Sequence, residues 1–273
     1  MALLRGAFAQ FQEDDALTLG AALAFYAILS LAPLLVILIW VGTLLSSRAQ
    51  ETLSREIISL IGAEAGEGIR SIIEHSGRHP VLGSVSGIGS FIMLVIGAIG
   101  AFGQLQHSIN RIWDLQLVAH REVRNWIRRT LLSIGMILFL GILLPASVGV
   151  TAALSWLFGK WIVIDVAVSL MVFTLLFALV FKYLPDARIA WRDAWAGGFF
   201  TGLLFVAGKF AIGLYLGRSV IVSAYGAAGT LIVLLLWIYY SALIFFFGAE
   251  LTQIWAKASG RAIMPSGYAV RLE

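Results

Sequence analysis

The chain has 273 residues, of which 60% are hydrophobic and only 12% are charged, and its mean hydropathy is +0.93. This composition excludes a soluble globular protein and indicates a chain that folds within a membrane. Because there is no cysteine, disulfides and thiolate metal sites are excluded as well. The net charge of +4 could suit nucleic acid, but in a membrane protein basic residues more often record orientation.

The N-terminal residues 1–18 predict a short amphipathic helix on the membrane surface. Its apolar side chains at helical spacing are Leu3, Leu4, Ala7, Phe8 and Phe11. The acidic residues 13–15 follow. We expect them to cap the first span, because carboxylates favour a helix N-terminus.

Six apolar runs are each long enough to cross a bilayer core, which takes about 20 helical residues. The predicted spans cover residues 17–45, 82–105, 130–157, 161–184, 194–216 and 227–255. We therefore expect an all-α polytopic membrane protein, a single transmembrane domain over residues 1–273 built as a six-helix bundle with amphipathic surface helices. Small-residue faces would also permit a homo-oligomer, although such faces pack within one bundle equally often.

The longest polar segment, residues 46–81, predicts amphipathic helices on the periplasmic side, and it is a candidate docking surface for envelope proteins. His75 and His79 stand four residues apart there, a spacing that can bind metal. No third ligand is fixed by spacing, so we predict no metal site and no cofactor.

Basic residues set the predicted orientation. Six spans put both termini on one side, and the segments on that side carry most of the lysine and arginine. Because cytoplasmic loops carry this excess, both termini are predicted to be cytoplasmic. The tail that begins at Lys257 is short and polar, and we expect it to be loosely held.

Lys209 interrupts the fifth predicted span. A cation within hydrocarbon costs several kcal/mol unless it is paired or turned inward. Helical rotation places Gly198, Gly202 and Gly213 on the same face as Lys209, and glycine lets a neighbouring helix approach closely. Lys209 is therefore expected to face packed protein or a cavity.

Helical rise predicts two polar clusters. In the outer half Lys209 pairs with Asp165, whereas Glu250 is too close to the inner boundary to reach Lys209. The cytoplasmic cluster is expected to comprise Gln104, His107, Arg111, Lys182 and Glu250. Tyr26 and Ser30 form a further polar stripe on the first span. These residues are either a substrate pathway or separate structural pairs that fix helix register.

Four stretches together resemble the YihY/BrkB family. They are DDALTLGAALAFYAILSLAPLL at 14–35, GAIGAFGQLQHSINRIWD at 97–114, FKYLPDARIAWRDAWAGGFFTGLLFVAGKFAIGLYLG at 181–217, and AAGTLIVLLLWIYYSALIFFFGAEL at 227–251. The resemblance implies a multi-pass protein of the bacterial inner membrane, linked to envelope integrity and sometimes to lipid transport. The matching polar positions are Asp14, Tyr26, Ser30, Pro33, Asn110, Arg111, Pro185, Lys209 and Glu250.

The family has also carried the label ribonuclease BN, which this sequence does not support. Metal-dependent nucleases need several carboxylates or histidines that converge on one or two ions, and the cytoplasmic segments offer only scattered candidates. We therefore expect neither an enzyme nor a nucleic-acid partner.

The expected function is the handling or transport of an amphiphilic, anionic envelope component such as lipid, with membrane lipids as partners. Two alternatives remain open: a small-solute or ion permease, and a non-transporting scaffold for envelope assembly.

Overall fold

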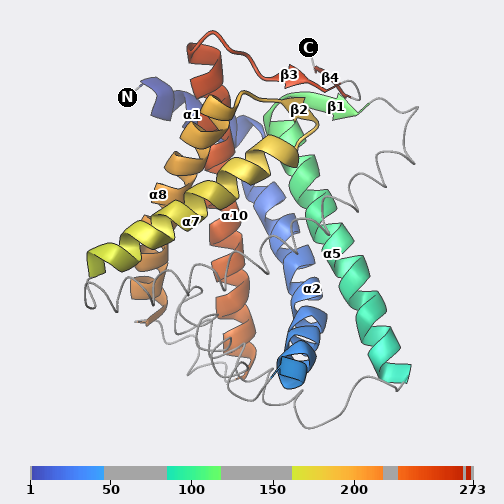
Figure 1. Cartoon of the computed structure of the whole chain (residues 1–273). Helices are drawn as coiled ribbons and strands as arrows, with labels where there is room; N and C mark the ends of the chain where they lie inside the picture. Colours follow the sequence, from blue (N-terminus) through green and yellow to red (C-terminus); the bar gives the residue numbers. More distant parts are fainter. Residues whose placement is uncertain (1, 46–84, 118–161, 218–226, 267–268, 272–273) are drawn as a thin grey trace. The chain divides into compact units, whose positions relative to one another are not determined.

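The structure is a computed structural model that describes residues 2–45, 85–117, 162–217, 227–266 and 269–271, and these are mostly helical (Figure 1). The helices are α1 (Ala2–Glu13), α2 (Ala16–Leu45), α5 (Val85–Ile112), α7 (Ile162–Tyr183), α8 (Trp191–Gly217) and α10 (Ala227–Ala258). The expectation of a mostly helical protein is thus confirmed. The predicted span over 130–157 and the amphipathic segment over 46–81 lie outside the described residues.

Five of the predicted spans overlap helices of the structure, namely α2, α5, α7, α8 and α10. Within the described residues, two stretches are long and apolar enough to cross a membrane, Val166–Tyr183 of α7 and Ile232–Ala258 of α10. The described apolar run of α2, Ala16–Ser30, is shorter. A bundle of six spans therefore stays a prediction.

The chain forms two compact units. The first comprises Met1–Gly20, Phe102–Gly208 and Ser241–Glu273, and the second comprises Ala21–Ala101 and Lys209–Tyr240. Helices α2, α5, α8 and α10 each contribute residues to both units.

A turn at Asp14 and Asp15 separates α1 from α2. The Asp14 N–H donates to the Gln10 carbonyl at 2.9 Å, and the Asp15 carbonyl accepts the Leu19 N–H at 3.2 Å. Asp15 has a φ of 53°, in the left-handed region that aspartate tolerates better than most residues. The acidic run therefore ends one helix and starts the next.

Aromatic side chains fill the core of the first unit. Phe173, Phe177 and Phe181 follow at four-residue steps, so they share one face of α7. The ring of Phe173 lies 4.6 Å from that of Phe205 on α8, and the ring of Phe181 lies 5.1 Å from that of Phe245 on α10. These centroid distances are typical of packed aromatic pairs.

Glycines of α8 bring its backbone against α7. A Cβ placed on Gly198 would lie 2.6 Å from the Thr174 carbonyl oxygen and 2.7 Å from the Ala178 nitrogen. A Cβ on Gly202 would lie 3.1 Å from the Thr174 nitrogen. The close approach expected of Gly198 and Gly202 is therefore confirmed.

The second unit contains a similar approach between α2 and α5. A Cβ on Gly97 would lie 2.8 Å from the Ser30 Cα, and one on Gly100 would lie 2.7 Å from the Tyr26 Cδ1. The polar stripe predicted on the first span therefore packs against glycines of α5.

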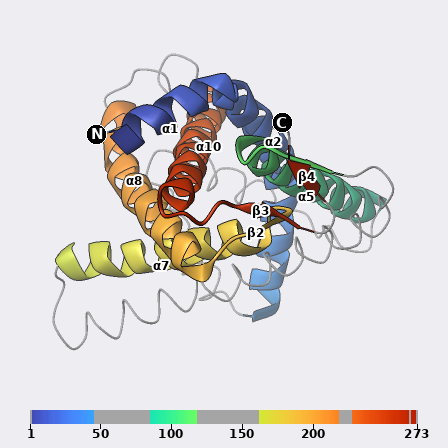
Figure 2. The same cartoon turned by 90° about the horizontal axis from the view of Figure 1, so that it is seen from above.

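The segment after α10 is held by two short antiparallel sheets, so the expectation of a loose tail is wrong. Strand β1 (Leu115–Leu117) pairs with β4 (Ala269–Arg271), and β2 (Ala187–Arg188) pairs with β3 (Met264–Pro265). Both sheets lie at the same end of the first unit (Figures 1 and 2). The physical reason is backbone pairing with loops far away in sequence, which composition does not reveal.

An ion pair reinforces this attachment. The Arg261 guanidinium donates to both carboxylate oxygens of Asp193, in the first turn of α8, at 3.0 and 2.8 Å. These hydrogen bonds raise the pKa of Arg261. The Asp193 side chain is almost fully buried, whereas that of Arg261 is partly exposed.

Candidate functional site

Helix α1 packs on the C-terminal part of α10 in the first unit (Figure 2). A Cβ on Gly6 would lie 3.3 Å from the Ile254 Cδ1, and the Phe11 ring lies 5.9 Å from the Phe247 ring in an edge-on arrangement. These contacts hold the turn after α1 against the part of α10 that carries Glu250.

Glu250 is a fully buried carboxyl group with 0% exposure. Among the described residues, no N–H or O–H group donates a hydrogen bond to either of its oxygens. The group that interacts with it is instead a second carboxyl group, that of Asp14 in the α1–α2 turn. Two ionised carboxylates are both acceptors, so a hydrogen bond between them needs a proton on one of the two.

Burial raises the pKa of Asp14 above its ordinary value of 3.8. The hydrogen bond with Glu250 and the charge of Arg111 oppose this shift, whereas the charges of Asp114 and Glu13 add to it. Because the folded chain then binds this proton more tightly than the unfolded chain, Asp14 stabilises the fold most at low pH. Its contribution is lost as the pH rises through the raised value.

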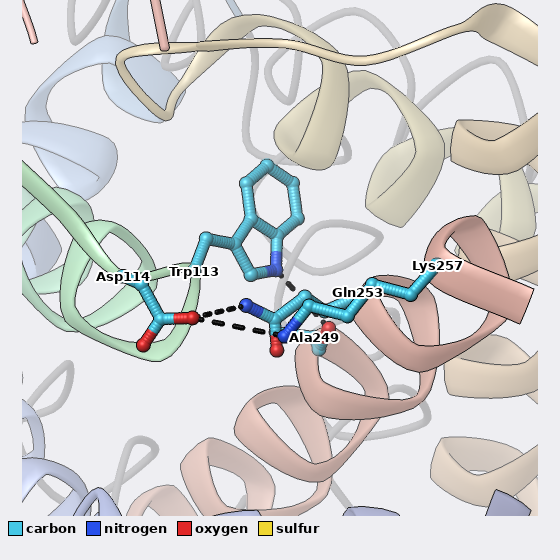
Figure 3. Close-up of polar contacts among 5 residues, drawn as sticks. All are labelled: Trp113, Asp114, Ala249, Gln253 and Lys257. Atoms are coloured by element: carbon cyan, nitrogen blue, oxygen red, sulfur yellow. Dashed lines mark hydrogen bonds and ion pairs between the residues drawn. The ribbon is translucent and has the colours of Figure 1, made fainter. Parts of the chain in front are cut away.

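Three contacts at the end of α5 fix that helix on α10 (Figure 3). The amide of Gln253 donates to the Asp114 Oδ2 at 3.0 Å, and the Lys257 Nζ lies 3.7 Å from the same oxygen. The buried indole of Trp113 donates to the carbonyl of Ala249, the residue before Glu250, at 3.1 Å. Asp114 has a φ of 56°, which turns the chain from α5 into β1.

A second buried carboxylate, Asp186, accepts hydrogen bonds from two side-chain amides. Gln106 and Asn110 of α5 donate to its Oδ2 at 3.0 and 2.9 Å, and its own N–H donates to the Asn110 Oδ1 at 2.9 Å. Pro185 precedes it and ends α7, because proline disfavours a helical residue before it. This cluster joins α5 to the α7–α8 link, and its satisfied hydrogen bonds fit a structural role.

The residues predicted at the cytoplasmic end make separate contacts in the structure, so the cluster stays a prediction. Gln104 donates to the Ser108 hydroxyl at 3.4 Å, and His107 is exposed. Arg111 is also exposed, and its charge acts on Asp14, the partner of Glu250. Lys182 instead donates to the Ile189 carbonyl at 2.5 Å.

Three other predicted pathway residues, Tyr26, Ser30 and Lys209, belong to the second unit. In the second unit, Tyr26 is partly exposed and the Ser30 hydroxyl donates to the Ala27 carbonyl at 2.9 Å. Lys209 is half-buried. Asp165 belongs to α7, but its side chain falls outside the described part of the chain. A pathway through these residues therefore stays a prediction.

Sequence reasoning did not find the pairing of Asp14 with Glu250 or the role of Asp114. The local sequence predicts that Asp14 is part of a helix cap, and no periodicity links the turn after α1 to α10. The one signal that pointed to both carboxyl groups was the resemblance, whose matching polar positions include Asp14 and Glu250.

Comparison with known proteins identifies the family. The model of the family described as virulence factor BrkB matches residues 7–267. The chain belongs to this family. Its match covers the α1–α2 turn, α5, the α7–α8 link and α10, and therefore the elements that position Asp14, Asp114, Asp186 and Glu250.

Relatives of this BrkB-family chain are membrane proteins. The UPF0761 membrane protein of Psychromonas ingrahamii is 30% identical over 261 residues, which cover 88% of this chain and 83% of that protein. Those of Verminephrobacter eiseniae and Pseudomonas aeruginosa are each 28% identical, over 89% and 92% of this chain. The chain spans 59% and 63% of the length of these two relatives. No solved structure is significantly similar to it.

The BrkB-family chain is thus a membrane protein, and the resemblance seen in the sequence is confirmed. Its buried carboxyl group Glu250 lies on α10, within a stretch apolar enough to cross a membrane. Among the residues described, no cluster of three or more histidine, aspartate or glutamate side chains could hold a metal ion.

Proposed function

We propose that this BrkB-family protein handles an anionic amphiphile of the envelope, such as a phospholipid, along the first half of α8. The observation that supports this most is a row of exposed apolar side chains at four-residue steps, here named the α8 stripe. It consists of Trp191, Trp195, Phe199 and Leu203, which are 43%, 45%, 44% and 47% exposed.

The α8 stripe has the chemistry of a lipid contact. In a membrane protein, exposed aromatic and aliphatic side chains suit acyl chains, and tryptophan favours the depth of the headgroups. Two exposed arginines, Arg188 and Arg192, lie at its N-terminal end. Arginine can donate two parallel hydrogen bonds to a phosphate, so tail and headgroup would find matching partners on one element.

The first tryptophan of the α8 stripe is held in place by α7. The Lys182 Nζ lies 5.4 Å from the Trp191 ring centroid, and the Tyr183 ring meets that of Trp191 edge-on at 5.9 Å. A cation over an aromatic face is attracted to it. Lys182 thus adds a third basic residue to this part of the sequence, which also contains Arg188 and Arg192.

Lys209 is proposed as a headgroup ligand further along α8. It is half-buried in an otherwise apolar stretch of α8, and basic residues within such stretches often mark the path of a substrate.

The test is the movement of labelled phosphatidylglycerol between the leaflets of reconstituted vesicles, with labelled phosphatidylcholine as the neutral comparison. We expect the Arg188→Gln/Arg192→Gln double variant and Lys209→Ala each to slow the anionic lipid several-fold relative to wild type. Arg5→Gln, which removes an exposed arginine of α1, is the matched control and should leave the rate unchanged.

Unchanged movement of phosphatidylglycerol in all variants would contradict the proposal. Flux of a small ion or solute across the vesicle membrane without lipid movement would favour the permease instead. If neither lipid nor solute moves in wild-type vesicles, the envelope-assembly scaffold becomes the better description.

A further inference from the structure

We propose that Asp14 and Glu250 form a proton-binding site that links the α1–α2 turn to α10. The site holds a single proton, shared between the two carboxyl groups. This assignment does not depend on the handling of lipid, since it concerns a buried pair in the first unit and not the α8 stripe.

The first argument is the arrangement of the pair. Glu250 has no exposed surface and no N–H or O–H donor among the described residues, and the group that interacts with it from the α1–α2 turn is another carboxyl group, that of Asp14. A buried ion without a counter-ion is strongly disfavoured, and two such ions side by side are disfavoured further. One shared proton removes a charge and supplies the missing donor in a single step.

The second argument is an excess of acceptors around the pair. The buried side-chain oxygens of α1 and α10 that accept no hydrogen bond from the described residues are Gln10 Oε1, Glu250 Oε1 and Oε2, and Gln253 Oε1. Gln10 precedes Asp14 by one helical turn, and Gln253 follows Glu250 by nearly one turn. Buried polar groups are normally paired, so a layer rich in acceptors favours a bound proton.

The third argument is the charge on the neighbouring elements. The charged groups that act on the pair are Glu13 of α1, Arg111 and Asp114 at the end of α5, and Lys257 of α10. Arg111 is exposed to solvent, and Lys257 lies 3.7 Å from the Asp114 carboxylate. Neither cation is within ion-pair distance of Glu250 among the described residues, so they do not replace the proton.

Loss of the proton has a structural consequence. Two ionised carboxylates in this position would repel each other inside the contact between α1 and α10. We therefore expect α1 to loosen from α10 as the pH rises, with the direction set by tighter proton binding in the folded state.

Infrared difference spectroscopy of the full-length protein in lipid nanodiscs tests the assignment directly. At neutral pH the wild-type protein should show the C=O band of a protonated, buried carboxyl group, and this band should be lost in Glu250→Gln. Glu13→Gln removes an exposed carboxyl next to Asp14 and should leave the band in place. If the wild type lacks the band, or Glu250→Gln keeps it, the proposal is overturned.

Thermal unfolding and hydrogen exchange provide the second readout. We expect wild-type stability and the protection of α1 amides to fall from mildly acidic to alkaline pH. Both Glu250→Gln and Asp14→Asn should weaken the dependence of stability and α1 protection on pH, because each variant retains only one of the two carboxyl groups. A slope that both variants keep would overturn the proposal. Suppression of the wild-type slope by sodium at constant ionic strength would also overturn it, in favour of a metal cation.

Discussion

Gly198 allows α7 and α8 to approach closely because it has no side chain. An added Cβ would meet the Thr174 carbonyl and the Ala178 nitrogen, which are backbone atoms with little freedom to move. We expect Gly198→Ala to lower the free energy of unfolding by about 1–3 kcal/mol, the usual cost of overpacking. Chemical denaturation in detergent measures this effect.

Gly103 provides the matched control for Gly198→Ala. It also lies within a helix, α5, but a Cβ there would meet no atom within 4 Å. Gly103→Ala should therefore leave stability unchanged or raise it slightly, because alanine is the better helix former. Equal losses in both variants would show that the α7–α8 approach is not tight.

At the same scale, single residues show where sequence reasoning succeeds. The glycine face of α8 was predictable, because helical rotation alone places Gly198 and Gly202 together. The partner of Glu250 was not, because Asp14 belongs to a turn whose position on α10 is set by tertiary packing. The local pattern of residues 13–15 fits a helix boundary equally well without that contact.

At the scale of elements, the Asp193–Arg261 pair fastens the segment after α10 to the start of α8. We expect Arg261→Gln to leave the buried Asp193 carboxylate without its bidentate partner. Hydrogen exchange should then increase in β2 and β3, measured by mass spectrometry of peptides around Arg188 and Met264. Arg192→Gln, a change at a nearby exposed arginine, should leave exchange in these strands as in wild type.

The elements also differ in how far the sequence predicts them. Long apolar runs predicted the helices, with α7 at 162–183 against an expected 161–184 and α10 at 227–258 against an expected 227–255. The sheets were missed, since strands of two or three residues have no detectable alternation. Their partners are also remote, as in the pairing of Leu115 with Arg271.

At the scale of the whole molecule, the C-terminal segment completes the first unit. Removing residues 260–273 would delete β3 and β4 together with Arg261, so β1 and β2 would lose their pairing strands at once. We expect this truncation to lower the melting temperature by several degrees and by more than Arg261→Gln does. Differential scanning fluorimetry in detergent compares the two. A truncated protein as stable as wild type would mean that the sheets contribute nothing to the fold.

The indole of Trp113 gives the protein a built-in spectroscopic reporter. Its N–H is bonded to the Ala249 carbonyl, one residue from Glu250, and its ring is sealed from solvent beside Phe181. A fluorine label on this tryptophan, identified by its absence in Trp113→Phe, would therefore sense any shift of α10 against α5. Following that resonance through a pH titration would report rearrangements around Glu250 while Asp14 and Glu250 both remain unmutated.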